Sequence, residues 1–436
     1  MKPIQVGLLG VGTVGSGTAT VLKRNAEEIS RRAGRSIVLR MAADLNVEQA
    51  REICGEGVEI VADGRTLVTH PEIDIVVELI GGTGIARELV LAAIDSGKHV
   101  VTANKKLLAE YGNEIFSRAQ AKGVIVAFEA AVAGGIPIIK ALREGLTANR
   151  IEWIAGIING TSNFILTEMR EKGSPFADVL AEAQRLGYAE ADPTFDIEGH
   201  DAAHKLTIMS AIAFGIPMQF EKCYLEGISK LDARDIRYAE ELGYRVKLLG
   251  ITKRNERGVE LRVHPTLIPE SRLIANVNGV MNAVLAKGDA VGATLYYGAG
   301  AGSLPTASAV VADLVDVTRL ATADPEHRVP HLAFQPDQLA DLPILSIDEV
   351  ESSYYLRVTV ADRAGVLADI TRLLADEGIS IEALIQKGSE RDANAEIVLL
   401  THRVMEKNIN AAMTKIEALS SVTQPITRLR MEALNG

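Results

Sequence analysis

The sequence predicts an α/β protein of three parts: an N-terminal domain with a parallel sheet, a central α+β domain and a C-terminal domain of the ferredoxin-like type. Three observations lead to this prediction. The chain has 436 residues, which is too long for one ordinary core and indicates two to four domains. Short apolar runs alternate with helical segments over residues 1–130. The C-terminal elements follow the order strand-helix-strand-strand-helix-strand.

The composition excludes several classes of protein. Hydrophobic residues make up 47% of the chain and charged residues 24%, so burial of apolar side chains can offset the entropy lost on folding, and disorder is not expected. The formal net charge of −11 disfavours a nucleic-acid partner, and an aromatic content of 4% disfavours base stacking. No segment has about 20 uninterrupted apolar residues, so we expect no membrane span.

The two cysteines and the N-terminus indicate the cellular compartment. Cys54 and Cys223 lie far apart and form no metal-binding pattern, which argues against a disulfide scaffold or a zinc module and fits a reducing compartment. The apolar start from Val6 to Val14 is rich in glycine and runs into charged residues, so we interpret it as a strand and turn rather than a signal sequence. We therefore expect a cytoplasmic protein.

The N-terminal domain is expected to span residues 1–130. Buried apolar strands that alternate with helices imply right-handed crossovers and a parallel sheet covered on both faces. The predicted strands are Ile4–Gly10, Ser36–Ala43, Val58–Ala62, Ile73–Ile80, Lys98–Thr102 and Val124–Phe128.

The central domain, which mixes helices and strands, is expected over residues 131–305. A loop rich in small residues is predicted at Gly298–Leu304, followed by a helix over residues 306–322 that is long enough to return to the N-terminal domain. Residues 323–350 contain four prolines (Pro325, Pro330, Pro336 and Pro343), which suits a stiff linker. The other predicted helices are Ser174–Leu186, Gly199–Phe214 and Asp232–Leu248, and the strand-like runs are Arg150–Ile158, Val246–Thr252 and Val259–Leu267.

The C-terminal domain is expected over residues 351–436. Its elements give the split βαβ order of a ferredoxin-like fold, with a turn at Asp362-Arg363-Ala364-Gly365 after the first strand. The predicted strands are Tyr354–Val360, Ile379–Lys387, Ala395–Thr401 and Ile426–Met431, and the helices are Val366–Glu377 and Met405–Leu419.

A glycine-rich motif follows the first strand and opens a helix. In Gly10-Val11-Gly12-Thr13-Val14-Gly15, Gly10 suits a tight turn, Gly12 lets the backbone approach a pyrophosphate, and Gly15 lets helix and strand pack closely. The helix N-terminus then favours the negative charge of the pyrophosphate. The strand before the motif and the helix after it predict a Rossmann-type dinucleotide site.

Two further strand ends bear on the cofactor. Asp44 follows the second strand, where an acid bonds the ribose hydroxyls of NAD and repels the 2′-phosphate of NADP. Arg40 lies nearby and is either a residue that favours NADP or a solvated residue at the strand edge, so the choice between NAD and NADP stays open. Asn104-Lys105-Lys106 follows the strand that ends at Thr102, and ligands bind beyond the carboxyl ends of parallel strands. Each lysine is either a cofactor-facing group or a solvated start of a helix.

The stretch from Tyr188 to Lys205 combines an acidic loop with a strongly apolar helix. Asp201 and Lys205 are four residues apart near the helix start, so their side chains converge on one face. A solvated pair would not be expected to open such an apolar helix, which favours a functional interpretation. His200 and His204 share the same spacing but have no convincing third ligand. We therefore disfavour a metal site and expect His204 to be structural.

These motifs together resemble homoserine dehydrogenase. The resemblance covers about residues 4–320 and rests on Gly156-Ile157-Ile158-Asn159-Gly160-Thr161-Ser162-Asn163-Phe164-Ile165-Leu166, the stretch Glu190–Lys205, Asn104-Lys105, and the loop Gly298–Thr306. The tail from about residue 353 is similar to an ACT domain, with Asp362-Arg363-Ala364-Gly365-Val366-Leu367 in place of its ligand loop.

The resemblance implies an NAD(P)-dependent interconversion of L-homoserine and L-aspartate 4-semialdehyde, on the route to threonine, methionine and isoleucine. It makes Lys205 the acid/base, oriented by Asp201, with Lys105 between nicotinamide and substrate and assigned the proton role in a few members. A lysine ammonium, with a reference pKa of about 10.4, can polarise the carbonyl and then donate a proton, so oxidation should favour alkaline pH. The implied substrate residues are Glu190 for the amino group, Thr161, Gly160, Asp192 and Asp196.

The resemblance also implies several ligands. A monovalent cation, usually sodium, would be held by Glu129 and the carbonyls of Val132, Gly134 and Ile136; from sequence alone, a glycine-rich hinge with a capping glutamate is an equal alternative. An amino-acid effector such as threonine would bind the ACT domain, and the chain would form a homodimer or homotetramer. The implied cofactor residues are Gly10, Gly12, Thr13, Val14, Gly15, Asp44, Thr102, Lys105 and Gly302, and the implied effector residues are Asp362, Gly365, Val366 and Leu367.

Two alternative functions fit part of the pattern. A 2-hydroxy-acid dehydrogenase of the phosphoglycerate type also joins a Rossmann domain to an ACT tail, but it leaves the Glu190–Lys205 stretch without a task. A non-enzymatic sensor of cofactor and amino acid has no reason to keep an acidic loop beside an apolar helix.

Overall fold

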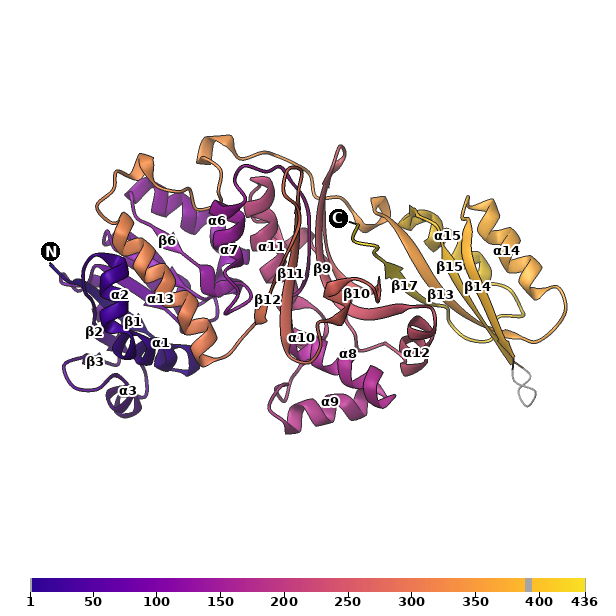
Figure 1. Ribbon diagram of the computed structural model, residues 1–436, viewed down its shortest axis with the longest axis horizontal. Coiled ribbons are helices and arrows are strands. Elements are labelled where there is room, and N and C mark those ends of the chain that lie inside the picture. Colours follow the sequence, from indigo (N-terminus) through magenta and orange to yellow (C-terminus); the bar gives the residue numbers. More distant parts are fainter. Residues whose placement is uncertain (1, 389–393, 436) are drawn as a thin grey trace. The chain divides into compact units, whose positions relative to one another are not determined.

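The computed structural model describes residues 2–388 and 394–435 (Figure 1). The chain forms two compact units, each assembled from separate stretches of sequence. The first unit contains residues 1–160, 201–221 and 280–342, and the second contains residues 161–200, 222–279 and 343–436. In the described ranges no helix is both long and apolar enough to cross a membrane.

The first unit is built on a six-stranded parallel sheet with the order β3-β2-β1-β4-β5-β6. This is the order of the doubly wound dinucleotide-binding fold, as the alternation of strands and helices predicts. The strands are β1 (Ile4–Leu9), β2 (Ile37–Ala43), β3 (Glu59–Val61), β4 (Ile75–Glu78), β5 (His99–Thr102) and β6 (Val126–Ala127).

Helices connect the strands of this sheet. They are α1 (Thr13–Arg24), α2 (Ala26–Ala33), α3 (Val47–Cys54), α4 (Gly64–Thr69), α5 (Ile85–Asp95) and α6 (Lys105–Lys122). A late helix, α13 (Ser303–Leu320), lies beside α1 and α2, orange against indigo in Figure 1. Its Ala307, Val310 and Leu314 are fully buried in one core with Val6 and Leu8 of β1.

The first unit also holds an antiparallel sheet that the sequence only partly predicts. β7 (Ile151–Ile157) pairs with β11 (Met281–Gly288), which forms a hairpin with β12 (Gly292–Ala299). The prediction of a loop from Gly298 is wrong at its first two residues, because Gly298 and Ala299 pair with Asn282 and Met281. α13 likewise begins at Ser303 instead of residue 306, since Pro305 is tolerated in the first turn of a helix. Three short elements precede β7, namely η1 (Glu129–Ala131), α7 (Ile138–Lys140) and η2 (Ala141–Gly145).

Most of α11 (His200–Phe214) belongs to the first unit. Its residues from Asp201 to Phe214 are all buried, including Asp201, His204 and Lys205. A helix that is buried all round needs partners for every charged group it carries.

The second unit joins part of the central region to the C-terminal domain. Its strands follow the order β9-β10-β17-β13-β15-β14, and β10 (Gly258–Pro269) runs parallel to β17 (Thr427–Met431). The remaining strands of this unit are β8 (Tyr224–Leu225), β9 (Tyr244–Asn255), β13 (Glu351–Ala361), β14 (Ile381–Gly388), β15 (Asn394–Thr401) and β16 (Val404–Met405). Its helices are α8 (Gly160–Lys172), α9 (Phe176–Arg185), α10 (Thr194–Ile197), α12 (Ala233–Glu241), η4 (Leu273–Asn276), η7 (Ile347–Glu349), α14 (Val366–Asp376) and α15 (Glu406–Glu417). Three short helices, η3 (Phe220–Lys222), η5 (Pro325–His327) and η6 (Pro336–Gln338), belong wholly or mostly to the first unit.

The prediction of one helix over residues 232–248 is wrong in its second half. Asp232 caps α12 by accepting a hydrogen bond from the Arg234 amide, and the helix ends at Glu241. Gly243 then adopts a positive φ of 82°, and β9 begins at the next residue and pairs with β10 along its whole length. A glycine in the left-handed conformation ends a helix readily.

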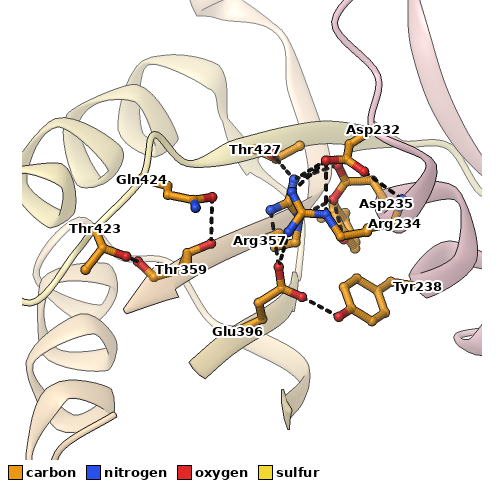
Figure 2. Close-up of polar contacts among 11 residues, drawn as sticks. Asp232, Arg234, Asp235, Tyr238, Arg357, Thr359, Glu396, Thr423, Gln424 and Thr427 are labelled. Atoms are coloured by element: carbon orange, nitrogen blue, oxygen red, sulfur yellow. Dashed lines mark hydrogen bonds and ion pairs between the residues drawn. The ribbon is translucent and has the colours of Figure 1, made fainter. Parts of the chain in front are cut away.

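Buried ion pairs attach the C-terminal domain to α12 (Figure 2). Arg357 of β13 donates from Nε to Asp235 Oδ1 at 2.6 Å and from Nη2 to Oδ2 at 2.9 Å. Tyr355 also donates its hydroxyl to Asp235, which is completely buried, and Glu396 lies on the other side of the Arg357 guanidinium. We call Arg357, Asp235, Asp232, Arg234 and Glu396 the docking cluster.

Candidate active site

The glycine-rich turn has the geometry that a dinucleotide requires. Gly10 has a φ of +90°, and a Cβ there would lie 2.9 Å from the carbonyl oxygen of Leu79. A Cβ on Gly15 would lie 2.1 Å from the carbonyl oxygen of Gly10, so helix and strand approach closely at this point. By contrast, a Cβ on Gly12 would meet nothing within 4 Å, which leaves open space at the N-terminus of α1. Thr13 and Val14 form the first turn of α1, whose amides are suited to a pyrophosphate.

Asp44 holds this turn in place. Its Oδ2 accepts a hydrogen bond from the Val11 amide at 2.7 Å, and its Oδ1 accepts one from the Asn46 amide at 2.8 Å. Arg40 instead pairs with Glu72 at 3.2 Å and with Glu59 at 3.7 Å, so two carboxylates already neutralise its charge.

Gly302 and Ser303 bring the start of α13 to the start of α1. Ser303 donates its hydroxyl to the carbonyl of Thr13 at 2.8 Å. A Cβ on Gly17 would lie 2.6 Å from the Ser303 carbonyl oxygen, so only glycine permits this approach. Gly302, the N-cap of α13, has a φ of +123°.

A buried carboxylate, which the sequence analysis missed, organises the ends of β4 and β5. Glu78 accepts hydrogen bonds from the amides of Ile80 and Gly81, both at 2.9 Å, and from the Thr102 hydroxyl at 2.7 Å. Thr102 is fully buried and in turn accepts from the Asn104 amide at 3.0 Å. The only available signal was an acid at the end of an apolar strand.

Asn104 then places Lys105 as the first residue of α6. Its side-chain oxygen accepts from the Leu107 amide at 3.1 Å, and its Nδ2 donates to the Gly82 carbonyl at 2.7 Å. These two hydrogen bonds hold Asn104 as the N-cap of α6. The backbone at the start of the helix therefore determines the direction of the Lys105 side chain.

Lys105, Asp201 and Lys205 form one cluster in the first unit. Lys205 Nζ lies 2.7 Å from Asp201 Oδ2, and Lys105 Nζ lies 3.0 Å from Asp201 Oδ1. The contact predicted from the spacing of Asp201 and Lys205 is therefore confirmed. The Lys205 and Asp201 side chains are 10% and 5% exposed, whereas that of Lys105 is 35% exposed.

Two residues just before α8 complete the cluster. Lys205 also donates to the Ile158 carbonyl at 2.7 Å, and Asn159 Nδ2 donates to Asp201 Oδ2 at 2.9 Å. Both residues belong to the motif from Gly156 to Leu166, but nothing in the sequence alone assigns either of them a role. A Cβ on the next residue, Gly160, would lie 2.8 Å from the Val280 carbonyl oxygen, so this position needs glycine.

The cluster keeps Asp201 ionised. Burial by itself would raise the pKa of this carboxyl, but the charges of Lys205 and Lys105 and the hydrogen bonds from Lys205 and Asn159 hold the pKa well below its usual range. A permanent carboxylate at this point orients Lys205 Nζ and favours its charged form.

The predicted substrate residues of the second unit lie on α8, on one loop and on the short helix α10 that follows this loop. Thr161, in the first turn of α8, donates its hydroxyl to the Tyr188 carbonyl at 2.7 Å. Glu190 is exposed, and its main-chain carbonyl accepts from Gln184 Nε2 at 3.0 Å, which fixes the loop but leaves the carboxylate to other partners.

Asp192 of this loop and Asp196 of α10 have different surroundings. Asp192 is exposed and accepts from the Thr194 amide at 3.1 Å, and the Thr194 hydrogen bonds lower the pKa of its carboxyl. Asp196 is half-buried, and its main-chain carbonyl accepts from the Ser162 hydroxyl at 3.0 Å. Asp192 thus shapes the loop, and Ser162 ties Asp196 to α8.

The predicted cation residues share one loop of the first unit. The Glu129 carboxylate accepts from the amides of Ile139 at 2.9 Å and Lys140 at 2.8 Å, as the capping alternative expects. Burial raises the pKa of this carboxyl. The carbonyls of Val132 and Gly134 lie in buried residues and accept no hydrogen bond from the described residues, whereas that of Ile136 accepts from Ile138. Two buried carbonyls without a donor, in the same stretch of chain as a buried carboxylate, are the kind of oxygen ligands that suit a monovalent cation.

His204 contacts Phe220, with ring centroids 4.2 Å apart, and its Nε2 lies 3.7 Å from Glu110 Oε1. Within residues 2–388 and 394–435, no three His, Cys, Asp or Glu side chains gather in a way that could hold a metal ion.

The predicted effector residues lie in the turn before α14 and in the first turn of that helix. Gly365 has a φ of +94° and caps the helix, Val366 is buried, and Asp362 is exposed. Leu367 packs against the core of the C-terminal domain.

Three family models match successive parts of the chain. The model described as "Homoserine dehydrogenase, NAD binding domain" matches residues 10–129, "Homoserine dehydrogenase" matches residues 137–315, and "ACT domain" matches residues 354–421.

Full-length relatives carry the same description. The homoserine dehydrogenases of Neisseria gonorrhoeae and Pseudomonas aeruginosa are 68% and 64% identical to this chain, and each match covers 100% of both proteins. The crystal structure of a homoserine dehydrogenase from Thiobacillus denitrificans is 71% identical, with a TM-score of 0.96 over 100% of this chain and 99% of that one. A hyperthermophilic archaeal homoserine dehydrogenase in complex with NADPH is 27% identical, with a TM-score of 0.63 over 73% of this chain and 98% of its own.

Proposed function

This chain belongs to the homoserine dehydrogenase family and carries a C-terminal ACT regulatory domain, and from that premise we propose that Lys205 moves the proton in its reaction. Family membership makes it an NAD(P)-dependent oxidoreductase. It also removes the grounds for the phosphoglycerate-type dehydrogenase and the non-enzymatic sensor.

The observation that carries the proposal is the position of Lys205 Nζ, buried and 2.7 Å from Asp201 Oδ2. When bound, the reduced cofactor supplies a hydride to the aldehyde carbon of L-aspartate 4-semialdehyde. Lys205 polarises the aldehyde oxygen and then donates a proton to it, and in the oxidation of L-homoserine the neutral amine takes the proton back. Oxidation therefore speeds up toward alkaline pH.

Asp201 and Lys105 act on this amine in different ways. Asp201 accepts from Lys205 through Oδ2 and contacts Lys105 through Oδ1, so it orients both ammonium groups. Lys105 is more exposed and follows β5, at the edge of the sheet where ligands bind, which suits a place between nicotinamide and substrate.

We assign the substrate's polar groups to the loop before α11 and to the start of α8. The exposed Glu190 carboxylate would accept the α-ammonium group of the substrate. Thr161 and Gly160 would contact the substrate at the start of α8. Asp192 and Asp196 would line the same site.

The first unit's glycine-rich turn fits NAD or NADP. The open space at Gly12 and the amides of Thr13, Val14 and Gly15 would receive the pyrophosphate, and Asp44 would bond the ribose hydroxyls. Thr102 and Gly302 would border the cofactor at the ends of β5 and β12, and Lys105 would lie beside its nicotinamide.

Two further ligands belong to the proposal. Glu129 with the carbonyls of Val132, Gly134 and Ile136 would hold sodium in a structural role. The turn with Asp362, Gly365, Val366 and Leu367 would take an amino acid such as threonine and inhibit the enzyme. We also infer a cytoplasmic homodimer or homotetramer.

One assay tests the catalytic assignment. Cofactor reduction with L-homoserine is followed in the parent enzyme and in Lys205→Ala, Lys105→Ala and Glu190→Gln. Lys205→Ala should lose most of kcat, whereas Glu190→Gln should mainly raise KM. Unchanged turnover in Lys205→Ala, or a larger loss in Lys105→Ala, would remove Lys205 from the acid/base role.

A truncation tests the regulatory assignment. A chain ending at residue 349 should still oxidise L-homoserine but should no longer be inhibited by threonine. An equal threonine response in the full and shortened chains would contradict it.

A further inference from the structure

A cavity of about 860 Å³ opens within the second unit. Its walls come from the turn between α10 and α11, from the segment that follows β8, and from α15 with the start of β17. None of the predicted effector residues, Asp362 to Leu367, lines it. The cavity is therefore separate from the turn before α14.

Two carboxylates with spare accepting capacity line this cavity. Glu226 uses one oxygen, Oε2, to accept from Tyr224 Oη at 2.9 Å and Arg430 Nη1 at 2.8 Å, and its Oε1 accepts nothing from the described residues. Glu198, also in the wall, has a half-buried side chain without a hydrogen bond or ion pair to any described residue. Partly desolvated carboxylates of this kind favour a cationic partner.

Two cations line the same cavity. Lys230 is exposed, and its ammonium forms no ion pair with the described residues. Arg428 contacts Glu406 at 2.8 Å and Asn410 at 2.5 Å through Nη1, but its Nη2 is 3.8 Å from Glu226. Its Nε is buried and finds no acceptor among the residues that the structure describes.

The neighbouring Arg430 differs from Arg428, because all three of its guanidinium nitrogens donate hydrogen bonds. Arg430, two residues further along β17, donates from Nε and Nη2 to Glu406 and from Nη1 to Glu226, and it is 1% exposed. Arg428 is 16% exposed and lines the cavity, and its Nη2 donates no hydrogen bond to the described residues. An arginine fork that is only partly used can accept another carboxylate.

We propose that this cavity binds a zwitterionic α-amino acid, as a second amino-acid site besides the turn before α14. Glu198 and Glu226 bind its ammonium group, and Arg428 and Lys230 bind its carboxylate. A simple anion is repelled by the two carboxylates and a simple cation by Arg428 and Lys230, so the wall selects a ligand that carries both charges.

Occupancy of this site connects two functional parts of the chain. Glu198 and His200 line the cavity, and Asp201, which contacts Lys205, is the next residue. The other wall belongs to the ACT domain. A bound amino acid therefore fixes the turn before Asp201 against the ACT domain and changes turnover, an effect that rests on the proposed role of Lys205.

The test measures binding without any turnover. The full chain with Gly365→Val, which blocks the turn before α14, is titrated calorimetrically with each of the twenty protein amino acids. At least one should bind saturably, and its N-acetyl and methyl ester derivatives should bind at least tenfold more weakly. Glu198→Gln combined with Lys230→Ala should weaken binding at least tenfold, while the matched surface variant Glu256→Gln should leave it unchanged.

The proposal is overturned if no amino acid binds, or if binding persists in the Glu198→Gln/Lys230→Ala variant. It is also overturned if Gly365→Val by itself abolishes binding while Gly365→Ala retains it, because the ligand would then occupy the turn before α14. The result is distinguishable from a failure of the proposed mechanism, because Lys205→Ala should abolish turnover yet bind the amino acid normally.

Discussion

The first unit holds the Lys105–Asp201–Lys205 cluster and the second unit holds the docking cluster, and the two use the same ingredients differently. Each has a buried aspartate in contact with a buried cation, at 2.7 Å for Lys205 and Asp201 and at 2.6 Å for Arg357 and Asp235. In the first the cations are lysines, and in the second they are arginines.

The type of cation decides what each cluster can do. A lysine ammonium is a compact charge that can give up and regain a proton, whereas an arginine guanidinium stays protonated at any relevant pH. Arg357 engages both oxygens of Asp235 at once, which fixes a geometry between α12 and β13 (Figure 2). Lys205 shares its ammonium between a carboxylate and the Ile158 carbonyl, an arrangement suited to proton transfer. The comparison separates a buried ion pair whose cation can take part in proton transfer from one whose cation can only fix a geometry.

The largest effect should come from exchanging the cation in the first cluster. Lys205→Arg keeps the positive charge but cannot release a proton, so kcat should fall roughly 10²- to 10⁴-fold, the contribution typical of general acid–base catalysis. Steady-state kinetics with L-homoserine measures this, and Lys106→Arg, the same exchange in α6 next to Lys105, is the control. A kcat within threefold of the parent would mean that Lys205 acts through charge alone.

The next effect concerns the docking cluster. Arg357→Met leaves the fully buried Asp235 without its main cation, so the free energy of unfolding should fall by about 3–5 kcal/mol. Denaturant unfolding measures the loss, and Arg357→Met/Asp235→Leu should recover most of it because no charge is left buried. If the single variant were as stable as the parent, the docking cluster would not attach the ACT domain.

A buried lysine of the second unit tests whether a buried cation that can lose a proton must serve the chemistry. Lys247 is 2% exposed and donates to the Val277 carbonyl at 2.5 Å and to Asn163 Oδ1 at 3.2 Å. Burial, together with the nearby charges of Arg170 and Arg245, lowers the pKa of Lys247 to about 7. Between this pKa and the unfolded value of about 10.4 the unfolded chain binds the extra proton, so stability should rise with pH in that window.

Lys247→Met should remove the rise of stability with pH between about pH 7 and about 10.4. The variant should lose about 1–3 kcal/mol of stability at pH 9, because acceptors are left without a donor. Thermal unfolding from pH 7 to 10 measures both effects, and kcat should stay within threefold of the parent at pH 8. A collapse of kcat in the folded variant would show that this lysine, too, serves the chemistry.

The smallest effect should come from an acid at the surface. Asp44→Ser removes a negative charge from the ribose side of the cofactor site, which is worth about 1 kcal/mol at 4 Å in water, so the ratio of kcat/KM for NADP to that for NAD should rise roughly fivefold. The serine hydroxyl can still accept from the Val11 amide. An unchanged ratio would mean that Asp44 only supports the turn.

Local sequence patterns predicted a large part of the fold and of the site. The alternation of strands and helices predicted the parallel sheet, and the four-residue spacing of Asp201 and Lys205 predicted their contact. The β11–β12 hairpin and the start of β9 were missed, because their patterns overlap those of a loop and a helix and were decided by strand pairing.

By itself, therefore, the sequence determined the glycine turn, the alternating elements of the parallel sheet and the contact between Asp201 and Lys205, since these depend on neighbours within one turn or one strand. Only the tertiary structure decided that Lys105 and Asn159 meet Asp201, that Arg40 pairs with Glu72, and that Arg357 meets Asp235, which lies 122 residues away. Contacts between distant segments depend on how whole elements pack, and a pattern read along the chain carries no record of that packing.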